Sequence, residues 1–295
     1  MISRKIFVLL FFLIWPLLAD FPAWAALASR HRADHQTMAP VFLPLQNWLI
    51  EQGVPAATTI KYLEQAQFEG KLLASMLSRK EISRDYQVFF APNKLEQARV
   101  FKARYLAFLE QTVLATGVPG EVIVAILLIE SDLGGNTGKT GIFNALASQA
   151  VLDSALAREK LAIFWPIQQK DYLASEAALT RFAKRAAWAR EELLTLIHLS
   201  GQWRVSPLSI KGSPAGALGW CQFMPTSIER WGADGSGDGQ VDVYNPLDAI
   251  VSVGHYLQEH GWRVDASREE QLQVVLTYNK STPYAQAVLE LADKL

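Results

Sequence analysis

Apolar residues recur at helical spacing along most of the chain. Residues 41–68 carry apolar positions three and four apart, interrupted by glycine and proline, and a further helix is expected around 100–114. Pro119 suits the first position of the next helix, and 172–199, rich in alanine, leucine and paired charges, predicts one or two helices covering the core. Strand patterns are few and confined to a short irregular or β portion near 204–244. The pattern therefore predicts a mainly α (α+β) fold.

One acidic residue ends the most apolar of these segments. Eight consecutive apolar residues, Val122–Ile129, lead to Glu130, and a polar, glycine-rich stretch from Ser131 to Gly135 follows. A carboxyl group at the end of an apolar helix keeps its proton more easily than one in water, because desolvation disfavours its charged form. Glu130 is therefore a candidate general acid.

The first residues predict export from the cytoplasm. Arg4 and Lys5 precede an apolar stretch at 6–18, and Ala23-Trp24-Ala25 has the small-x-small pattern of a cleavage site. The apolar stretch is about 13 residues long and a membrane-spanning helix needs about 20, so we interpret 1–25 as a cleaved signal peptide, with a permanent anchor as the less favoured alternative. We expect a soluble periplasmic protein, in which the one cysteine of the chain cannot form an internal disulfide.

Composition narrows the class of partner. The chain has 28 basic and 29 acidic residues, and half of its residues are hydrophobic. This balance argues against nucleic acid or an anionic membrane as the main partner. The nine tryptophans fit either a hydrophobic core or a sugar-binding groove, where aromatic faces are common.

Two segments in the C-terminal half suggest binding. Between 211 and 227, glycines allow a close backbone approach, and Ser213 and Gln222 could orient amide or hydroxyl groups of a substrate; a loop entering a helix, with Gln222 as a structural amide, fits the spacing equally. From Asp234 to Asp242, the pattern matches the first half of an EF-hand calcium loop, whose alternative is a solvated Gly-Asp turn.

The loop pattern specifies its ligands. They would be the side chains of Asp234, Ser236 and Asp238 and the backbone carbonyl of Gln240, with Asn245 where an EF-hand has its closing glutamate. The stretch 134–140 looks like a phosphate-binding loop, but Leu133 stands where that loop needs its first glycine, and the stretch follows an apparent helix rather than a strand. No organic cofactor is expected.

Several of these motifs together resemble one enzyme family. The chain resembles the lytic transglycosylases of the membrane-bound B type, glycoside hydrolase family 103, over about residues 110–295. The motifs that carry the resemblance are Glu130-Ser131, Gly138-Lys139-Thr140, Asn144-Ala145-Leu146-Ala147, Lys211-Gly212-Ser213, Gln222-Phe223-Met224-Pro225, Asp248-Ala249-Ile250 and Tyr278-Asn279. The chain departs from the family pattern at Asp132-Leu133 and Trp220-Cys221.

The resemblance implies an architecture. It implies a lysozyme-like catalytic core at 111–295 with a helical insertion at about 151–204, preceded by an N-terminal helical region at 26–110. It also implies a structural calcium ion, held by a loop that Asp248 closes.

The resemblance also implies a reaction. The substrate would be the β-1,4 bond between N-acetylmuramic acid and N-acetylglucosamine in peptidoglycan strands. Glu130 matches the catalytic acid/base, Ser213 and Gln222 match substrate-binding positions, and Tyr278 and Asn279 fall in the tail motif beside the cleft. We expect the chain to act as a monomer.

The mechanism follows from the lone acid. Ordinary glycosidases need two carboxylates, and the sequence offers Glu130 no convincing partner. One acid suffices if the substrate's own carbon-6 hydroxyl attacks and a 1,6-anhydro sugar forms. The alternatives are a muramidase that hydrolyses the same bond with water and a peptidoglycan-binding protein without catalysis.

Overall fold

Helices dominate the computed structural model, which describes residues 38–78 and 85–295. The signal peptide predicted for 1–25 lies outside the described residues, as does the beginning of the N-terminal region predicted for 26–110. Apart from Met38, all described residues belong to the unit Ala39–Leu295.

The elements confirm the predicted mainly α class. Two short strands, β1 (Thr140–Gly141) and β2 (Lys211–Gly212), pair antiparallel, with Thr140 opposite Gly212. Short 3-10 helices are η1 (Pro40–Phe42), η2 (Gln87–Phe90), η3 (Ile167–Ala174) and η4 (Pro207–Ser209). The α-helices of the described residues are α2 (Leu43–Glu51), α3 (Ala56–Leu63), α4 (Gly70–Leu77), α5 (Pro92–Arg104), α6 (Leu106–Thr116), α7 (Gly120–Ser131), α8 (Ile142–Ala150), α9 (Ala155–Ala162), α10 (Glu176–Gln202), α11 (Pro225–Trp231), α12 (Pro246–Glu259), α13 (Arg268–Tyr278) and α14 (Thr282–Ala292).

Two expectations about helix boundaries can be compared with these elements. The helix expected around 100–114 is interrupted, because Tyr105 leaves the helical region (φ −108°, ψ 20°) and separates α5 from α6. The segment 172–199 is the end of η3 followed by one long helix, α10. At its start, the Ser175 hydroxyl oxygen accepts a hydrogen bond from Ala178 N, as a helix-capping serine does.

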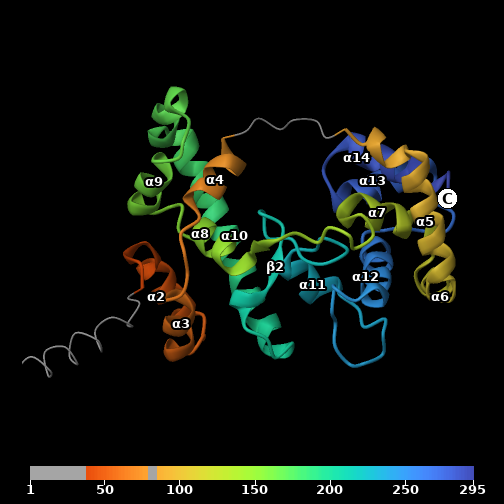
Figure 1. The fold of residues 1–295 in the computed structure, drawn as a ribbon, viewed down its shortest axis with the longest axis horizontal. Coiled ribbons are helices and arrows are strands. Elements are labelled where there is room, and N and C mark those ends of the chain that lie inside the picture. The colour runs from red at the N-terminus through yellow and green to blue at the C-terminus, as the bar shows by residue number, and fades with distance from the viewer. Residues whose placement is uncertain (1–37, 79–84) are drawn as a thin grey trace, which may run out of the picture. The chain divides into compact units, whose positions relative to one another are not determined.

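Helix α7 is the central helix of one core. Every residue from Val122 to Ile129 is buried, as expected for a helix that is apolar on all sides. Helices α5, α6, α12 and α14 pack around it, and Figure 1 shows α5, α12 and α14 near α7. Among the described residues, no single helix is long and apolar enough to cross a membrane; α6 and α7 together meet that test by length and composition, but they are bent by 113° relative to each other.

A second hydrophobic cluster joins segments far apart in the sequence. Leu73, Ala74 and Leu77 of α4 pack with residues of the predicted insertion, among them Trp165 and Phe182. The insertion predicted for 151–204 therefore shares its core with a helix of the N-terminal region. Its long helix, α10, packs along α8, the helix that directly follows β1 in the chain.

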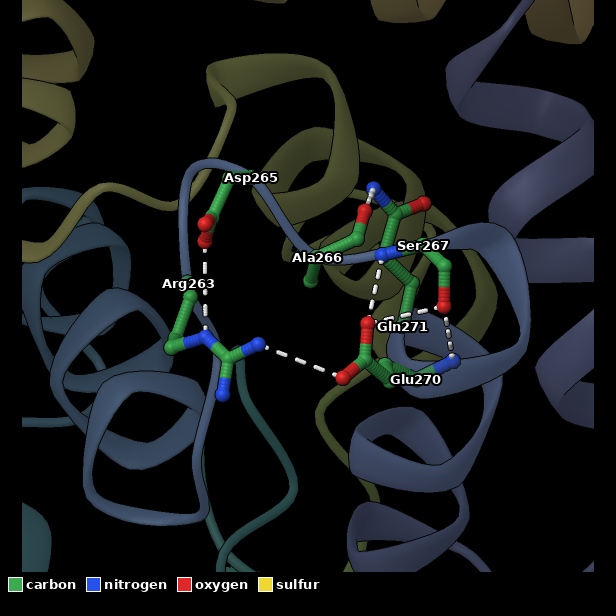
Figure 2. Close-up of polar contacts among 6 residues, drawn as sticks. All are labelled: Arg263, Asp265, Ala266, Ser267, Glu270 and Gln271. Atoms are coloured by element: carbon green, nitrogen blue, oxygen red, sulfur yellow. Dashed lines mark hydrogen bonds and ion pairs between the residues drawn. The ribbon is translucent and has the colours of Figure 1, made fainter.

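Polar contacts order the connection between α12 and α13. The Glu270 carboxylate accepts hydrogen bonds from both the backbone N–H and the hydroxyl of Ser267, each 2.8 Å long, and so completes a capping box at the start of α13. Figure 2 shows the Arg263 guanidinium between Asp265 and Glu270, 3.4 Å and 3.2 Å from their carboxylate oxygens. These side chains are exposed, so the pairs contribute mainly to the local conformation.

Candidate active site

Glu130 lies in the last turn of α7, one residue before the helix ends, and is half-buried. The chain leaves the helix through Asp132 and Leu133, both in the left-handed region with φ of 55° and 53°. Such a conformation costs about 1–2 kcal/mol for each non-glycine residue. Lys94 of α5 helps to hold it, because its ammonium lies 2.6 Å from Asp132 Oδ1. The helix end therefore presents Glu130 at a tightly specified turn.

The hydroxyl of Ser131 connects this turn to a second one. Ser131 Oγ donates a hydrogen bond to the carbonyl oxygen of Trp220 (2.7 Å) and accepts one from Gly134 N (3.0 Å). Ser131 is only 1% exposed, so these bonds are shielded from water. The segment around Trp220 is thereby attached to the residue that follows Glu130.

Gln222 lies in this second turn. Leu218 and Phe223 are bridged by two backbone hydrogen bonds of 2.8 and 3.2 Å, which close the turn. Gln222 itself has φ +50°, and its Nε2 donates to Gly219 O (2.8 Å) and Thr137 O (3.3 Å). Its amide therefore supports the turn, and its Oε1 is the acceptor it can offer to a substrate.

Tyr278 supports the same turn from α13. Its hydroxyl donates a hydrogen bond of 2.5 Å to the carbonyl oxygen of Cys221. Burial raises the pKa of Tyr278 well above its ordinary value, and its electrostatic neighbours Cys221 and Glu130 raise it further. Burial likewise raises the pKa of the Cys221 thiol to about 12, with a smaller contribution from Glu130. Glu130, Cys221 and Tyr278 thus lie within electrostatic reach of one another.

The remaining predicted substrate residues flank these turns. Ser213 follows β2, where its Oγ accepts a hydrogen bond from Ala217 N (3.0 Å) and keeps its own hydrogen to donate. Pairing of β1 with β2 brings Gly138 against the backbone of Gly212, so the segment after the Glu130 turn reaches Ser213. Asn279 is exposed at the end of α13.

The predicted calcium loop connects α11 and α12. The Asp234 carboxylate accepts hydrogen bonds from Ser236 Oγ (3.2 Å) and Gly239 N (2.7 Å). Asp238 Oδ1 accepts one from Gln240 N (2.8 Å). Both carboxylates are exposed, and in this conformation they bind the amides of their own loop.

Asp248 has a different environment from these exposed acids. It is fully buried, and its Oδ1 accepts hydrogen bonds from Gly235 N (3.0 Å) and Ser236 N (2.8 Å), while Oδ2 accepts one from Asp242 N (2.7 Å). It therefore ties the beginning of the loop to its end. Within the described ranges, no three His, Cys, Asp or Glu side chains are grouped closely enough to hold a metal. The chemistry of the oxygen donors nevertheless fits a hard cation such as calcium.

Some organising contacts were not indicated by the sequence pattern. Glu192 is one of the paired charges of 172–199, and nothing in that pattern indicated that it is buried. In the structure it is 3% exposed and accepts hydrogen bonds from Thr226. Its position beside Leu193, on the buried side of α10, was the available clue. The partners of Ser131 and Tyr278 lie 89 and 57 residues away in the chain, and no local pattern predicts them.

A separate hollow of about 750 Å³ lies at the α6–α7 corner, lined by residues such as Gly117, Trp262 and Val264. None of the candidate site residues lines it. This hollow is therefore separate from the candidate site around Glu130.

A family comparison places most of the chain in one family. The model of the transglycosylase SLT domain matches residues 39–270. The chain belongs to this family. It is 33% identical over 174 residues to membrane-bound lytic murein transglycosylase B of Escherichia coli (strain K12), an alignment that covers 59% of this chain and 40% of that protein. The match thus spans well under half of the length of this relative.

Solved structures share the fold. The Escherichia coli lytic transglycosylase SLT35, solved with bulgecin A and with calcium, aligns with TM-scores of 0.70 and 0.69 at 23% identity, over 86% of this chain and 92% of SLT35. SltB3 from Pseudomonas aeruginosa, solved with NAG-anhNAM-pentapeptide, aligns with a TM-score of 0.65 at 19% identity, over 86% of this chain and 79% of SltB3. The predicted lysozyme-like, mainly α fold is confirmed by this likeness.

Proposed function

We propose that the chain is a peptidoglycan lytic transglycosylase that cleaves the β-1,4 bond between N-acetylmuramic acid and N-acetylglucosamine. The observation that carries the proposal is the convergence of Glu130 with the Gln222 turn. Ser131 and Tyr278 donate hydrogen bonds to the carbonyl oxygens of Trp220 and Cys221, the two residues before Gln222. Membership of the transglycosylase SLT domain family supports it.

Glu130 would act first as acid and then as base. It protonates the glycosidic oxygen as the bond from that oxygen to the muramic acid's anomeric carbon breaks. The carbon-6 hydroxyl of the same sugar then attacks the anomeric carbon and returns its proton to the Glu130 carboxylate. The 1,6-anhydro sugar and the free 4-hydroxyl contain all atoms of the substrate, and no water is consumed.

The surroundings of Asp132 support a mechanism with one acid. It is the acidic residue nearest to Glu130 in the sequence, but it leaves the helix in a left-handed conformation and is paired with Lys94. A group held in this way is poorly suited to serve as a second catalytic carboxylate. The substrate's own hydroxyl supplies the nucleophile instead.

The substrate would bind along the turns that flank Glu130. Gln222 Oε1 would accept from an amide or hydroxyl of the glycan, and the Ser213 hydroxyl would donate to it. Asn279 is exposed and could contact a neighbouring sugar. Tyr278 contributes by supporting Cys221. The ligand in the SltB3 structure, NAG-anhNAM-pentapeptide, has the chemistry expected of this product.

The decisive experiment replaces Glu130 by Gln, which keeps the shape of the side chain and removes the acid. We expect the rate of peptidoglycan digestion to fall by about 100- to 10,000-fold, the usual contribution of acid/base catalysis. Glu121→Gln, in the first turn of the same helix, is the matched control and should keep wild-type activity. Near-normal activity of the Glu130→Gln protein would remove Glu130 from the mechanism.

Product mass separates this proposal from its rivals. Mass spectrometry of digested peptidoglycan should show anhydro products, which are one water lighter than the reducing sugars that a hydrolytic muramidase releases. A peptidoglycan-binding protein without catalysis would bind purified cell walls and leave no clearing in a renaturing gel that contains them.

We also propose that the α11–α12 loop binds a structural calcium ion. Asp234, Ser236, Asp238 and the carbonyl of Gln240 would supply oxygen ligands. Asp248 would close the site. Both of its oxygens accept backbone hydrogen bonds, so an oxygen that binds calcium must either accept a hydrogen bond at the same time or give that hydrogen bond up. SLT35 was solved with calcium.

The calcium proposal is tested by melting temperature. Calcium should raise it relative to a chelator in the wild type, because a ligand that binds only the folded state stabilises that state. Asp234→Asn should abolish this difference, whereas Asp265→Asn, a change of an exposed acid in another loop, should preserve it. An identical melting temperature with calcium and with chelator would mean that the loop is a solvated turn.

The proposed location is the periplasm, with the chain soluble, monomeric and cleaved after Ala25. Mass spectrometry of the protein from fractionated cells should then give a mature chain that starts at Ala26. Recovery of the intact N-terminus in the membrane fraction would favour the anchored alternative.

A further inference from the structure

Glu192 is a buried carboxylate that the proposed mechanism does not use. Among the described residues, it and Asp248 are the only charged side chains that are buried. Glu192 lies on α10, 3% exposed, against the first turn of α11. A buried charge is costly unless its hydrogen bonds are satisfied, so its partners indicate what it does.

Two of its hydrogen bonds come from one residue at the start of α11. Glu192 Oε2 accepts a hydrogen bond from the backbone N of Thr226 (2.9 Å), and Oε1 accepts one from the Thr226 hydroxyl (2.8 Å). Helix α11 has no side-chain cap of its own, because Met224 stands at the N-cap and makes no such bond. Pro225 has no N–H, so Thr226 has the first amide that needs an acceptor. Glu192 caps α11 from another helix.

The pKa of Glu192 lies above its ordinary value, because the neighbours that favour its ionised form offset burial only in part. Burial raises the pKa of Glu192, while the hydrogen bonds from Thr226, the charge of Arg230 and a hydrogen bond from Trp188 lower it. A serine or aspartate at position 224 would cap the helix at the surface without this cost. Unlike such a local cap, the cap supplied by Glu192 of α10 also anchors the start of α11 to another helix.

The chain between Thr226 and Gln222 is stiff. Pro225 fixes its own φ and disfavours helical conformations of the preceding residue, and Met224 is accordingly extended (φ −70°, ψ 153°). Phe223 is paired with Leu218 through two backbone bonds. Gln222, next in line, has the strained φ of +50°. A strained conformation persists only where its surroundings over-determine it.

We propose that Glu192, acting through Thr226, is a positioning residue that holds Gln222 in the conformation needed at the active site. Tyr278 and Ser131 bind Cys221 and Trp220, the residues before Gln222. Glu192 anchors the residues after it. The strained turn is therefore restrained on both sides, and the anchor on the far side comes from a helix outside the α7 core. The functional part of this inference depends on the proposed transglycosylase activity.

Amide exchange tests the positioning without any assay of activity. In Glu192→Ala and Thr226→Val, two hydrogen-bonded amides of the turn, Trp220 N (bonded to Val243 O) and Phe223 N (bonded to Leu218 O), should exchange at least about tenfold faster than in the wild type, while those of α7 keep their wild-type rates. Glu191→Gln, an exposed acid beside Glu192, is the control and should leave both rates unchanged. Unchanged exchange of Trp220 and Phe223 in both variants would overturn the proposal.

A double-mutant cycle on purified peptidoglycan tests the connection to Gln222. Glu192→Ala should lower kcat/KM per folded molecule by about 10- to 100-fold, the effect of small displacements in an active site. In a Gln222→Ala background, the same change should cost less than about twofold, because its route of action is already lost. An equal loss in both backgrounds would mean that Glu192 acts in another way.

Two further measurements separate a failure of this inference from a variant that does not fold and from a failure of the proposed function. If Glu192→Ala does not fold, Glu192→Gln replaces it, because its amide can still accept from Thr226 N and donate to Thr226 Oγ1; its turn amides should then exchange at rates between those of the wild type and of Thr226→Val. Wild-type protein that yields no anhydro product would refute the proposed function alone, and the exchange rates would still decide the positioning.

Discussion

Gly138→Ala measures how much the site depends on a close backbone contact. A Cβ at Gly138 would lie 2.1 Å from the carbonyl oxygen of Gly212 and 2.6 Å from Ser213 N. Gly138 also has φ +92°, which alanine rarely adopts. Gly53 offers a matched control, because its φ is +89° and an added Cβ would meet no atom within 4 Å.

The two variants separate conformational strain from the steric clash. Both should lose about 1 kcal/mol from the positive φ. Only Gly138→Ala must also move backbone, which adds about 1–3 kcal/mol as overpacking does. Since 1 kcal/mol shifts the melting temperature of a domain of this size by about 2–4 °C, we expect decreases of about 2–4 °C for Gly53→Ala and about 4–16 °C for Gly138→Ala.

Differential scanning calorimetry supplies the melting temperatures, and digestion of purified peptidoglycan the activity. The Gly138 variant should also lose activity per folded molecule, because the clash displaces Ser213 N, whereas the Gly53 variant should not. Equal melting temperatures for the two variants would refute the reasoning, since strain alone would then account for both.

Three other outcomes are expected. Ser131→Ala removes bonds to the Trp220 carbonyl and to a backbone amide, so it should destabilise the protein by about 1–3 kcal/mol in chemical denaturation; a loss below 0.5 kcal/mol would contradict the role given to this hydroxyl. Lys102 lowers the pKa of Glu121 by a hydrogen bond, so Glu121 stabilises the fold above its ordinary pKa and this contribution is lost as pH falls through the lowered value. Glu121→Gln should accordingly lower the free energy of unfolding at pH 7, by less than about 1 kcal/mol because both side chains are partly exposed, and by a smaller amount at pH 3; a larger loss at pH 3 would reverse the sign. Burial raises the pKa of Cys221 to about 12, so iodoacetamide at pH 8 should label it only after unfolding, and rapid labelling of the native protein would place the thiol at the surface.

Helix positions and burial could largely be predicted from the sequence. The unbroken apolar run Val122–Ile129 predicted a buried helix, and it is the central helix α7. The break at Tyr105 could not be predicted, because periodicity continues through a change of helix direction when both helices face one core. Likewise, α4 looked like part of a separate N-terminal region, yet its apolar side is buried against Trp165 and Phe182.

For the candidate site, the sequence by itself determined which residues have suitable chemistry and where each stands in its own element. Glu130 ends an apolar helix, and Gln222 and Ser213 lie among glycines, because spacing, burial and turn chemistry are properties of neighbouring residues. Only the tertiary structure decided the partners: Tyr278 supports Cys221, Asp248 binds the amides of its loop, and Glu192 holds Thr226. These contacts join residues 12 to 57 positions apart, and a hydrogen bond between distant segments leaves no periodic trace in either of them.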